Sequence, residues 1–152
     1  MSSRTLVLLK PDAVERGLVG DIVGRFERKG LRIGAMELRT LDAATLARHY
    51  EEHVGKPFYA DLVAFMARGP VVAMVVEGPQ DTWEIVRAMM GVTNPRAAAP
   101  GTIRGDLGTL MTENLIHGSD SAPPRIAAHA SAASPTAASS RTARGKVEAF
   151  TR

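Results

Sequence analysis

His117 is the side chain in this sequence best suited to nucleophilic or metal chemistry. It ends the short apolar run of Leu115 and Ile116 and is followed at once by small polar residues, in the stretch ENLIHGSDS. Turn-forming residues beside it leave the imidazole poorly covered by neighbouring side chains. A neutral imidazole can act as a nucleophile or a metal ligand near neutral pH, because its ordinary pKa is about 6.5. The pattern alone leaves open a surface histidine, a metal ligand and a nucleophile.

Further cationic and polar side chains lie near predicted turns, namely Lys10, Arg87, Thr93, Arg104 and Asn114. Lysine supplies a point charge and arginine a planar fork, and both suit phosphate oxygens. The sequence contains no G-x-x-x-x-G-K-[ST] motif, and no H-R-D or D-F-G motif, so P-loop and protein-kinase mechanisms are excluded. A phosphate site in this chain would therefore be built from side chains. Taken one at a time, each of these residues could equally be a solvated surface group.

Other candidate chemistries have weaker support in the sequence. His49 and His53 are four residues apart on a predicted helix, a spacing that can hold zinc, but no third ligand candidate lies close by. HGSDS contains His, Ser and Asp, yet catalytic triads are defined by geometry rather than by adjacency, so a hydrolase is disfavoured. Phe58 suits a hydrophobic core as well as base stacking. The absence of cysteine excludes disulfides and thiolate metal sites and is compatible with a reducing compartment.

Apolar periodicity predicts the elements that must position these residues. It indicates strands at 5–10, 32–41 and 70–78, a last short strand in NLIHG, and helices at 19–30, 42–54, 58–69 and 79–91. The run PVVAMVVEG predicts a strand buried on both faces, and Asp42 is suited to cap a helix. Residues 92–113 form a long segment rich in Gly, Pro and Thr, and such loops are usually functional or disordered. The order predicts an α+β fold with a βαββαβ antiparallel sheet and helices on one face.

Length and charge narrow the function classes. A chain of 152 residues with 45% apolar residues predicts one domain with a core of ordinary size. The sequence pI near 9.7 suggests nucleic-acid binding, but residues 122–152 hold five Lys or Arg and one Glu, so the preceding part is not basic. We therefore expect no specific nucleic-acid partner. The first apolar run, of about four residues, is too short for a signal peptide or a membrane span, which predicts a cytoplasmic protein without a membrane partner.

Composition changes sharply near Ala122. Residues 122–152 are more than half Ala, Ser and Pro and contain almost no large apolar residues. Such a segment cannot bury enough apolar surface to offset its ordering entropy. The sequence therefore predicts a catalytic domain over 1–121 and a flexible segment over 122–152.

Taken together, five stretches resemble the motifs of nucleoside diphosphate kinases: TLVLLKPDAVERGLVGDIV, HYEEHVGKPFY, GPVVAMVVEG, TNPRAAAPGTIRGD and NLIHGSDS. The resemblance runs in order and nearly without gaps over about residues 1–121, and NLIHGSDS is highly specific to that family. It implies a ferredoxin-like fold and a ping-pong reaction, in which the γ-phosphate of a nucleoside triphosphate, typically ATP, passes to an enzyme histidine and then to a nucleoside diphosphate. It also implies Mg²⁺ held mainly by the nucleotide phosphates, without protein side-chain ligands, and a homo-oligomer, a tetramer or hexamer in the family.

The same resemblance implies roles for individual residues. The phosphorylated histidine corresponds to His117, with Tyr50 and Ser119 as supporting residues. The phosphate contacts correspond to Lys10, Arg87, Thr93 and Arg104. Sugar contacts fall on Asn114 together with Lys10, and the base stacks on Phe58 beside Leu62 and Met111. Stacking on an aromatic ring tolerates any base, since every base has a π-face, so broad nucleotide specificity is expected.

The sequence departs from the family after residue 121. The family continues with an amphipathic helix that carries a glutamate hydrogen-bonded to the catalytic histidine. Ala128 occupies the corresponding position, and Pro123 and Pro124 disfavour a continuous helix. We therefore predict reduced but not abolished activity; the alternative is a degenerate member that serves as a nucleotide-binding or interaction module with low turnover. The departure also leaves the size of the oligomer open.

Overall fold

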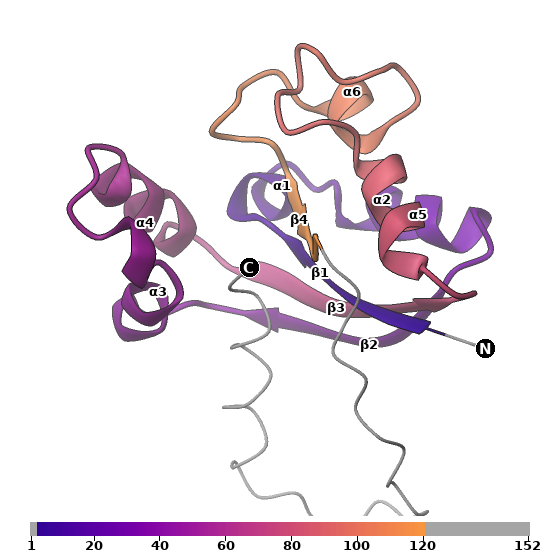
Figure 1. The fold of residues 1–152 in the computed structure, drawn as a ribbon, viewed down its shortest axis with the longest axis horizontal. Coiled ribbons are helices and arrows are strands. Elements are labelled where there is room, and N and C mark those ends of the chain that lie inside the picture. Colours follow the sequence, from indigo (N-terminus) through magenta and orange to yellow (C-terminus); the bar gives the residue numbers. More distant parts are fainter. Residues whose placement is uncertain (1–2, 121–152) are drawn as a thin grey trace, which may run out of the picture.

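The computed structural model of the chain describes residues 3–120 and is shown in Figure 1. The elements follow in the order β1 (Ser3–Leu9), α1 (Pro11–Glu15), α2 (Val19–Arg28), β2 (Arg32–Arg39), α3 (Ala43–His49), the 3₁₀ turn η1 (Glu51–His53), α4 (Tyr59–Ala67), β3 (Val71–Gly78), α5 (Thr82–Met90), α6 (Ile103–Leu107) and β4 (Ile116–Gly118). The prediction of a flexible segment over 122–152, and the position of Ala128, lie outside the described residues.

The four strands form one antiparallel sheet in the order β2-β3-β1-β4. This topology confirms the predicted α+β fold with a βαββαβ antiparallel sheet. β1 is a central strand, and Leu8 lies opposite Ala73 of β3 on one side and opposite His117 of β4 on the other. The strand that ends just before Lys10 and the strand that carries His117 are therefore direct neighbours.

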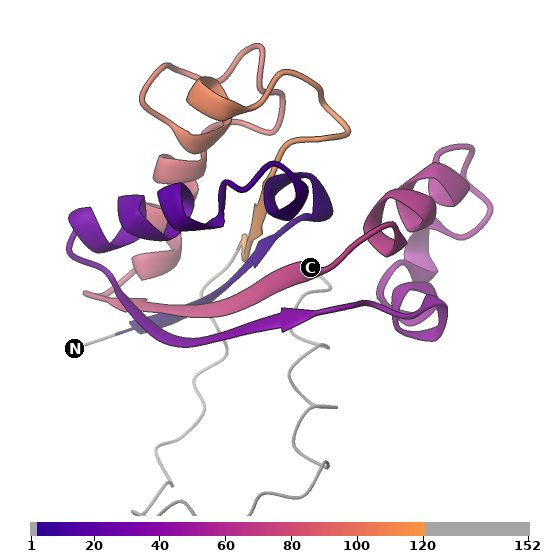
Figure 2. The same cartoon turned by 180° about the vertical axis from the view of Figure 1, so that it is seen from behind.

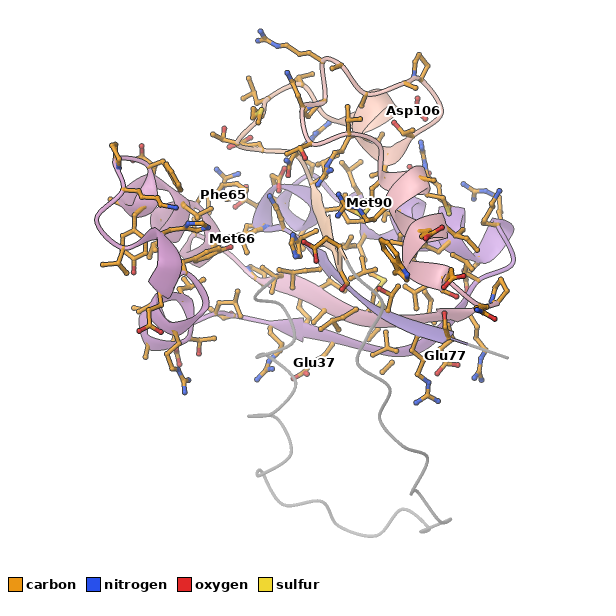
Figure 3. All side chains as sticks on the ribbon, viewed as in Figure 1. Glu37, Phe65, Met66, Glu77, Met90 and Asp106 are labelled. Atoms are coloured by element: carbon orange, nitrogen blue, oxygen red, sulfur yellow. The ribbon has the colours of Figure 1, made fainter. Side chains whose placement is uncertain are left out.

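α2 and α5 cover one face of the sheet, as Figures 1 and 2 show from opposite sides. Side chains from both helices and from alternate strand positions form the main core, among them Val7, Leu9, Ile22, Phe26, Met74, Val76, Val86 and Met90. Met90 points from α5 toward the sheet in Figure 3. Burying each large apolar side chain of this kind contributes roughly 1.5–3 kcal/mol. The amphipathic pattern predicted for 19–30 and 79–91 is thus explained by one shared apolar layer.

α3 and α4 form a pair at one end of the sheet. They pack through Leu46 and Met66 against Leu8 and Val71, which point away from α2 and α5. The predicted helices on one face are therefore confirmed for α2 and α5, while the α3–α4 pair adds a second, smaller core on the other side. β3 contributes to both cores, in agreement with a strand buried on both faces.

Local sequence signals account for the starts of three helices, two of which the periodicity did not predict. The Asp42 side chain accepts a hydrogen bond from the Thr45 N–H at 2.6 Å, as expected of a capping residue. α1 begins at Pro11, where the fixed φ of proline favours a first helical position. α6 begins after Thr102, whose hydroxyl accepts from the Gly105 N–H at 3.0 Å. Both helices span only five residues, too few to show a 3.6-residue period.

β2 is an edge strand, and nearly all of its residues are exposed. Met36 is 55% exposed and Leu38 is 64% exposed. On the opposite face of the sheet from Met36 and Leu38, Glu77 forms ion pairs with Arg4 at 2.8 Å and with Arg32, and Figure 3 shows Glu77 on the side away from α2 and α5. The alternation in 32–41 therefore predicts the strand correctly but not its burial.

Candidate nucleotide and phosphate site

A chain of hydrogen bonds joins three of the predicted site residues. Lys10 follows β1 directly, and its Nζ donates to Oδ1 of Asn114 at 2.7 Å. The Nδ2 of Asn114 donates in turn to the backbone carbonyl of Thr93 at 3.0 Å. Asn114 is 3% exposed, so its amide is held in one orientation by partners on either side. The structure thus gathers the end of β1, the loop after α5 and the segment before β4.

Arg104 connects the same segments from α6. Its guanidinium donates to the carbonyl oxygens of Asn114 at 3.2 Å, Gly91 at 3.1 Å and Ile116 at 2.6 Å. The side chain is buried, with 5% exposure for the residue. A planar fork of N–H groups is the only side chain that can serve several carbonyls in this way. Arg104 therefore has a structural role that the sequence did not reveal, beside the phosphate contact implied by the resemblance.

Burial and a neighbouring positive charge lower the pKa values of both Lys10 and Arg104. The pKa of Lys10 falls from 10.5 to about 8, first because the amine is buried and then because Arg104 is positive, while Asp12 opposes the change. Burial and the nearby Arg87 lower the pKa of Arg104 to about 10. Repulsion of this kind indicates that Lys10 lies near Arg104, and Arg104 near Arg87. A polyphosphate placed among them would relieve both the repulsion and the burial cost.

His117 lies half-buried in β4, which is paired with β1 over Val7–Leu9. The glycine that follows it has a packing reason: a Cβ on Gly118 would lie 2.8 Å from Sδ of Met90 and 3.5 Å from Cγ1 of Val86. A larger residue would require the Met90 side chain to move. Ser119 is also half-buried, and its N–H donates to the Leu6 carbonyl at 3.3 Å. The HGS sequence thus keeps the imidazole on a strand packed closely against the core.

The residues expected to hold the base lie on two elements. Phe58 precedes α4, is 50% exposed and forms an edge-on contact with His53 at 5.5 Å between ring centroids. The Leu62 N–H donates to the Phe58 carbonyl, so both residues lie on one turn of the helix. Met111, in the segment between α6 and β4, is 58% exposed. Tyr50 is half-buried, and burial raises the pKa of its hydroxyl.

Arg68 at the end of α4 ties the α3–α4 pair to the rest of the site. Its guanidinium binds both carboxylate oxygens of Glu15 in α1, at 3.0 and 2.9 Å, and Glu113 at 2.7 Å. Glu113 adjoins Asn114, so one arginine joins the base side to the phosphate side. The sequence gives no signal for this arrangement, because the partners are 53 and 45 positions away from Arg68.

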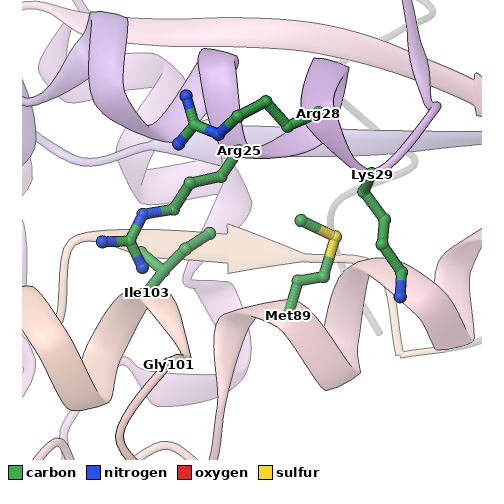
Figure 4. A pocket seen from close by; sticks show the side chains of 6 residues that line it. All are labelled: Arg25, Arg28, Lys29, Met89, Gly101 and Ile103. Atoms are coloured by element: carbon green, nitrogen blue, oxygen red, sulfur yellow. The ribbon is translucent and has the colours of Figure 1, made fainter.

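A separate cavity of about 380 Å³ lies between α2, α5 and the loop before α6, lined by Arg25, Arg28, Lys29, Met89, Gly101 and Ile103 (Figure 4). It contains none of the predicted site residues. Arg25 already binds the carboxylates of Asp21 at 3.1 Å and Asp106 at 2.7 Å. The charge of Arg25 at this cavity is therefore already paired with two carboxylates.

Two further features of residues 3–120 bear on the site. In this part of the chain no group of three or more His, Asp or Glu side chains is arranged to hold a metal ion. Over the same residues, no helix is long and apolar enough to cross a membrane.

Comparisons with known proteins identify the family to which the chain belongs. A family model described as nucleoside diphosphate kinase matches residues 3–139. A nucleoside diphosphate kinase of Streptomyces coelicolor is 66% identical over 122 residues, which cover 80% of this chain and 88% of the relative. One from Thermobifida fusca is 58% identical over 118 residues, covering 78% and 87%. The structure of a halophilic nucleoside diphosphate kinase from Halobacterium salinarum, in complex with CDP, is similar with a TM-score of 0.75 and 51% identity, covering 79% of this chain and 78% of that one.

The fold and these matches define a phosphotransferase of nucleotide metabolism. The chain belongs to the nucleoside diphosphate kinase family, and its activity is that of a nucleoside-diphosphate kinase. The resemblance seen in the motifs is thereby confirmed.

Proposed function

We propose that His117 carries the phosphoryl group between two nucleotides in a ping-pong reaction. An unprotonated ring nitrogen attacks the γ-phosphorus of a nucleoside triphosphate, the bond to the bridging oxygen breaks, and the nucleoside diphosphate leaves. In the second half-reaction a terminal phosphate oxygen of another nucleoside diphosphate attacks the phosphorus, and the nitrogen–phosphorus bond breaks. Dividing the transfer between two steps is the general advantage of a covalent intermediate.

The observation that carries this proposal is the hydrogen-bonded group formed by Lys10, Asn114 and Arg104 beside the strand of His117. Phosphoryl transfer spreads negative charge over the equatorial oxygens, so catalysis depends largely on positioning and on cations. In this proposal Lys10, Arg87, Thr93 and Arg104 contact phosphate oxygens, and Lys10 and Asn114 contact the sugar hydroxyls. Their repelling charges favour a polyanionic ligand.

The remaining roles concern the base and the histidine. Phe58 stacks on the base with Leu62 and Met111 beside it, which its 50% exposure allows. Tyr50 and Ser119 support the imidazole. Mg²⁺ enters as part of the nucleotide substrate and is held mainly by its phosphates, in keeping with the cationic character of the group around Lys10. We also propose a cytoplasmic location, with which the cysteine-free sequence is compatible.

Labelling with γ-³²P-ATP tests the role of His117. The chain should take up label that is lost in acid and retained in base, and His117→Ala should take up none. His49→Ala removes a histidine of α3 that has no part in the proposed site and is the matched control, which should label as the parent does. Label that persists in His117→Ala would refute the proposal, and a parent chain that binds ATP without taking up label would instead be a nucleotide-binding module.

We further propose that the chain forms a homo-oligomer. The supporting observation is the edge strand β2, which pairs only with β3 within residues 3–120 and exposes Met36 and Leu38. Long exposed edges with apolar side chains are usually covered by another chain. Light scattering coupled to size exclusion should give a mass several times that of one chain. A monomer at micromolar concentration would contradict the proposal.

A further inference from the structure

The backbone immediately before β4 is strained. Leu115 has φ +73°, in the left-handed region that residues with a Cβ rarely adopt, and its side chain is fully buried. The Ile116 N–H donates to the Asn114 carbonyl at 2.8 Å, two residues back. This bond and the positive φ define a γ-turn of the rare, strained kind. Such turns persist only where the surrounding structure holds them, and they concentrate at functional sites.

Asp12 holds this turn from α1. Its Oδ2 accepts the Leu115 N–H at 3.0 Å, while the Leu115 carbonyl accepts from the Lys10 N–H at 2.9 Å. Arg104 binds the carbonyls on both sides of Leu115, those of Asn114 and Ile116. Every polar backbone group in the centre of the turn therefore has a partner, and the Asp12 carboxylate is the acceptor for the Leu115 N–H.

The carboxyl group of Asp12 is itself costly to keep there. The residue is 1% exposed, and its Oδ1 has no hydrogen-bond partner among the described residues. Burial raises the pKa of this carboxyl, against the opposing effects of the Leu115 N–H and the Lys10 charge. A buried acceptor that is only half satisfied is unfavourable for folding alone. Its retention beside a strained turn two residues before His117 calls for a further reason.

We propose that Asp12 is a positioning residue for phosphoryl transfer, and that its carboxylate fixes the Leu115 turn so that β4 presents His117 to the phosphate site. β4 spans only three residues, so it has few bonds of its own to resist a change in the preceding turn. Without the acceptor at Asp12, the Leu115 N–H is buried unpaired and the turn relaxes. The relaxation displaces Asn114 on one side and His117 on the other.

This role depends on where the acceptor lies rather than on its charge. Asp12→Asn keeps an amide oxygen at the same distance from the backbone and removes the charge. Asp12→Glu keeps the charge but moves it outward by one methylene. If Asp12 positions the turn, the first substitution is tolerated and the second is not; if its charge mattered, the order would be reversed.

The inference rests on the proposed role of His117, and the test is the single-turnover rate at which ATP phosphorylates that histidine. Asp12→Asn should stay within about threefold of the parent, whereas Asp12→Glu and Asp12→Ala should lose about tenfold or more in rate at saturating ATP. Hydrogen exchange at the Leu115 amide should be protected in the parent and in Asp12→Asn only. Asp21→Asn, on the exposed surface of α2, is the matched control and should react as the parent does.

The outcomes separate cleanly. A parent chain that takes up no acid-labile label overturns the proposed role of His117 itself. A labelled parent with an impaired Asp12→Asn and an active Asp12→Glu overturns the positioning role in favour of charge. Parent-like rates in all three variants overturn it as well. Because Asp12→Asn removes a poorly solvated charge, it should fold even where Asp12→Ala does not. The single-turnover phosphorylation rate of Asp12→Asn then decides whether Asp12 is a positioning residue.

Discussion

Lys10 and Asn114 are 104 positions apart in the sequence, and their side chains meet at 2.7 Å between Nζ and Oδ1. This bond joins the end of the first strand to the segment that leads into the last. It holds the ammonium in a buried position beside Arg104, where its pKa is about 8 rather than 10.5. If Lys10 contacts phosphate, as proposed, a lysine kept so near its titration point makes ligand binding sensitive to pH.

Nucleotide affinity should fall as the pH rises above about 8. Below this pH, Lys10 is charged in the free protein and binds phosphate directly. Above it, the free amine is neutral, and a bound polyphosphate raises its pKa again, so binding takes up a proton and the affinity loss approaches about tenfold per pH unit. Calorimetry of ADP binding at a pH of about 8.5, in two buffers of different ionisation enthalpy, measures the number of protons taken up on binding.

Two substitutions show whether Lys10 is the titrating group. Lys10→Met should weaken binding at neutral pH and remove the dependence between pH values of about 7.5 and 9. Lys29→Met, which removes a lysine at the separate cavity, should leave the dependence intact. A pH dependence that survives in Lys10→Met would assign the proton to another group.

Arg104→Lys should destabilise the fold as well as impair catalysis. The lysine keeps a charge but cannot reach the carbonyls of Asn114, Gly91 and Ile116 together. Leaving two buried carbonyls without a donor costs about 2–4 kcal/mol in the free energy of unfolding, measured by urea denaturation. Arg96→Lys is the control, because Arg96 makes a single exposed bond to the Thr109 carbonyl, and it should change stability by less than about 0.5 kcal/mol.

Restoring the acid at position 128 and the helix that carries it should raise activity. The resemblance places a histidine-orienting glutamate where this chain has Ala128. A supporting contact of this kind changes rates by about tenfold to a hundredfold by analogy with the groups that orient metal ligands. Because Pro123 and Pro124 disfavour the helix that holds this acid in the family, we expect faster single-turnover phosphorylation of His117 when Ala128→Glu is combined with Pro123→Ala and Pro124→Ala, and not in Ala128→Glu alone. Equal rates in both variants and the parent would mean that the histidine is oriented without this acid.

The sequence predicted the sheet and the longer helices because those elements repeat a local pattern. Alternating or continuous apolar residues define β1 and β3, and Ile22 and Phe26 mark the buried side of α2. Asp42 caps α3 through a bond to a residue only three positions away. Each of these features is decided by neighbours in the chain, so a single sequence contains the information.

The contacts that build the site were largely beyond sequence reasoning. Asp12 and Leu115 are 103 positions apart, and their bond depends on the register between β1 and β4. Nothing in the motif KPD indicates that its acid is buried, and nothing in NLIH indicates a positive φ at the leucine. The residue types at Lys10, Arg104 and His117 suggested phosphate chemistry, but only the fold shows that Arg104 also holds the backbone around Asn114.

Phe58→Ala should weaken the binding of all nucleotides by a similar factor. The ring is half exposed, with His53 in an edge-on contact and the Lys56 ammonium 5.9 Å from the ring centroid, and the proposed contact with the base is stacking, which every base can provide. Loss of stacking costs about 1–3 kcal/mol per base. Dissociation constants for ADP, GDP and CDP should therefore rise together, while Val54→Ala, on the same exposed turn, should change none of them. A loss confined to one base would mean that hydrogen bonds rather than stacking select the nucleotide.

Two glycine substitutions should have opposite effects on stability. A Cβ on Gly105 in α6 would lie 2.0 Å from the backbone oxygen of Ala99, and no side-chain movement can relieve that contact. Gly105→Ala should therefore lower the free energy of unfolding by about 1–3 kcal/mol and shift α6, with Arg104, away from the carbonyls it binds. Gly20 in α2 has open space around its Cβ position, so Gly20→Ala should raise the free energy of unfolding by about 0.5–1 kcal/mol through helix propensity. Urea denaturation measures the free energy of unfolding of both variants. The phosphorylation rate of Gly105→Ala shows whether the shift of α6 also impairs the site. A Gly105→Ala variant as stable and as active as the parent would show that α6 can move without disturbing the arginine.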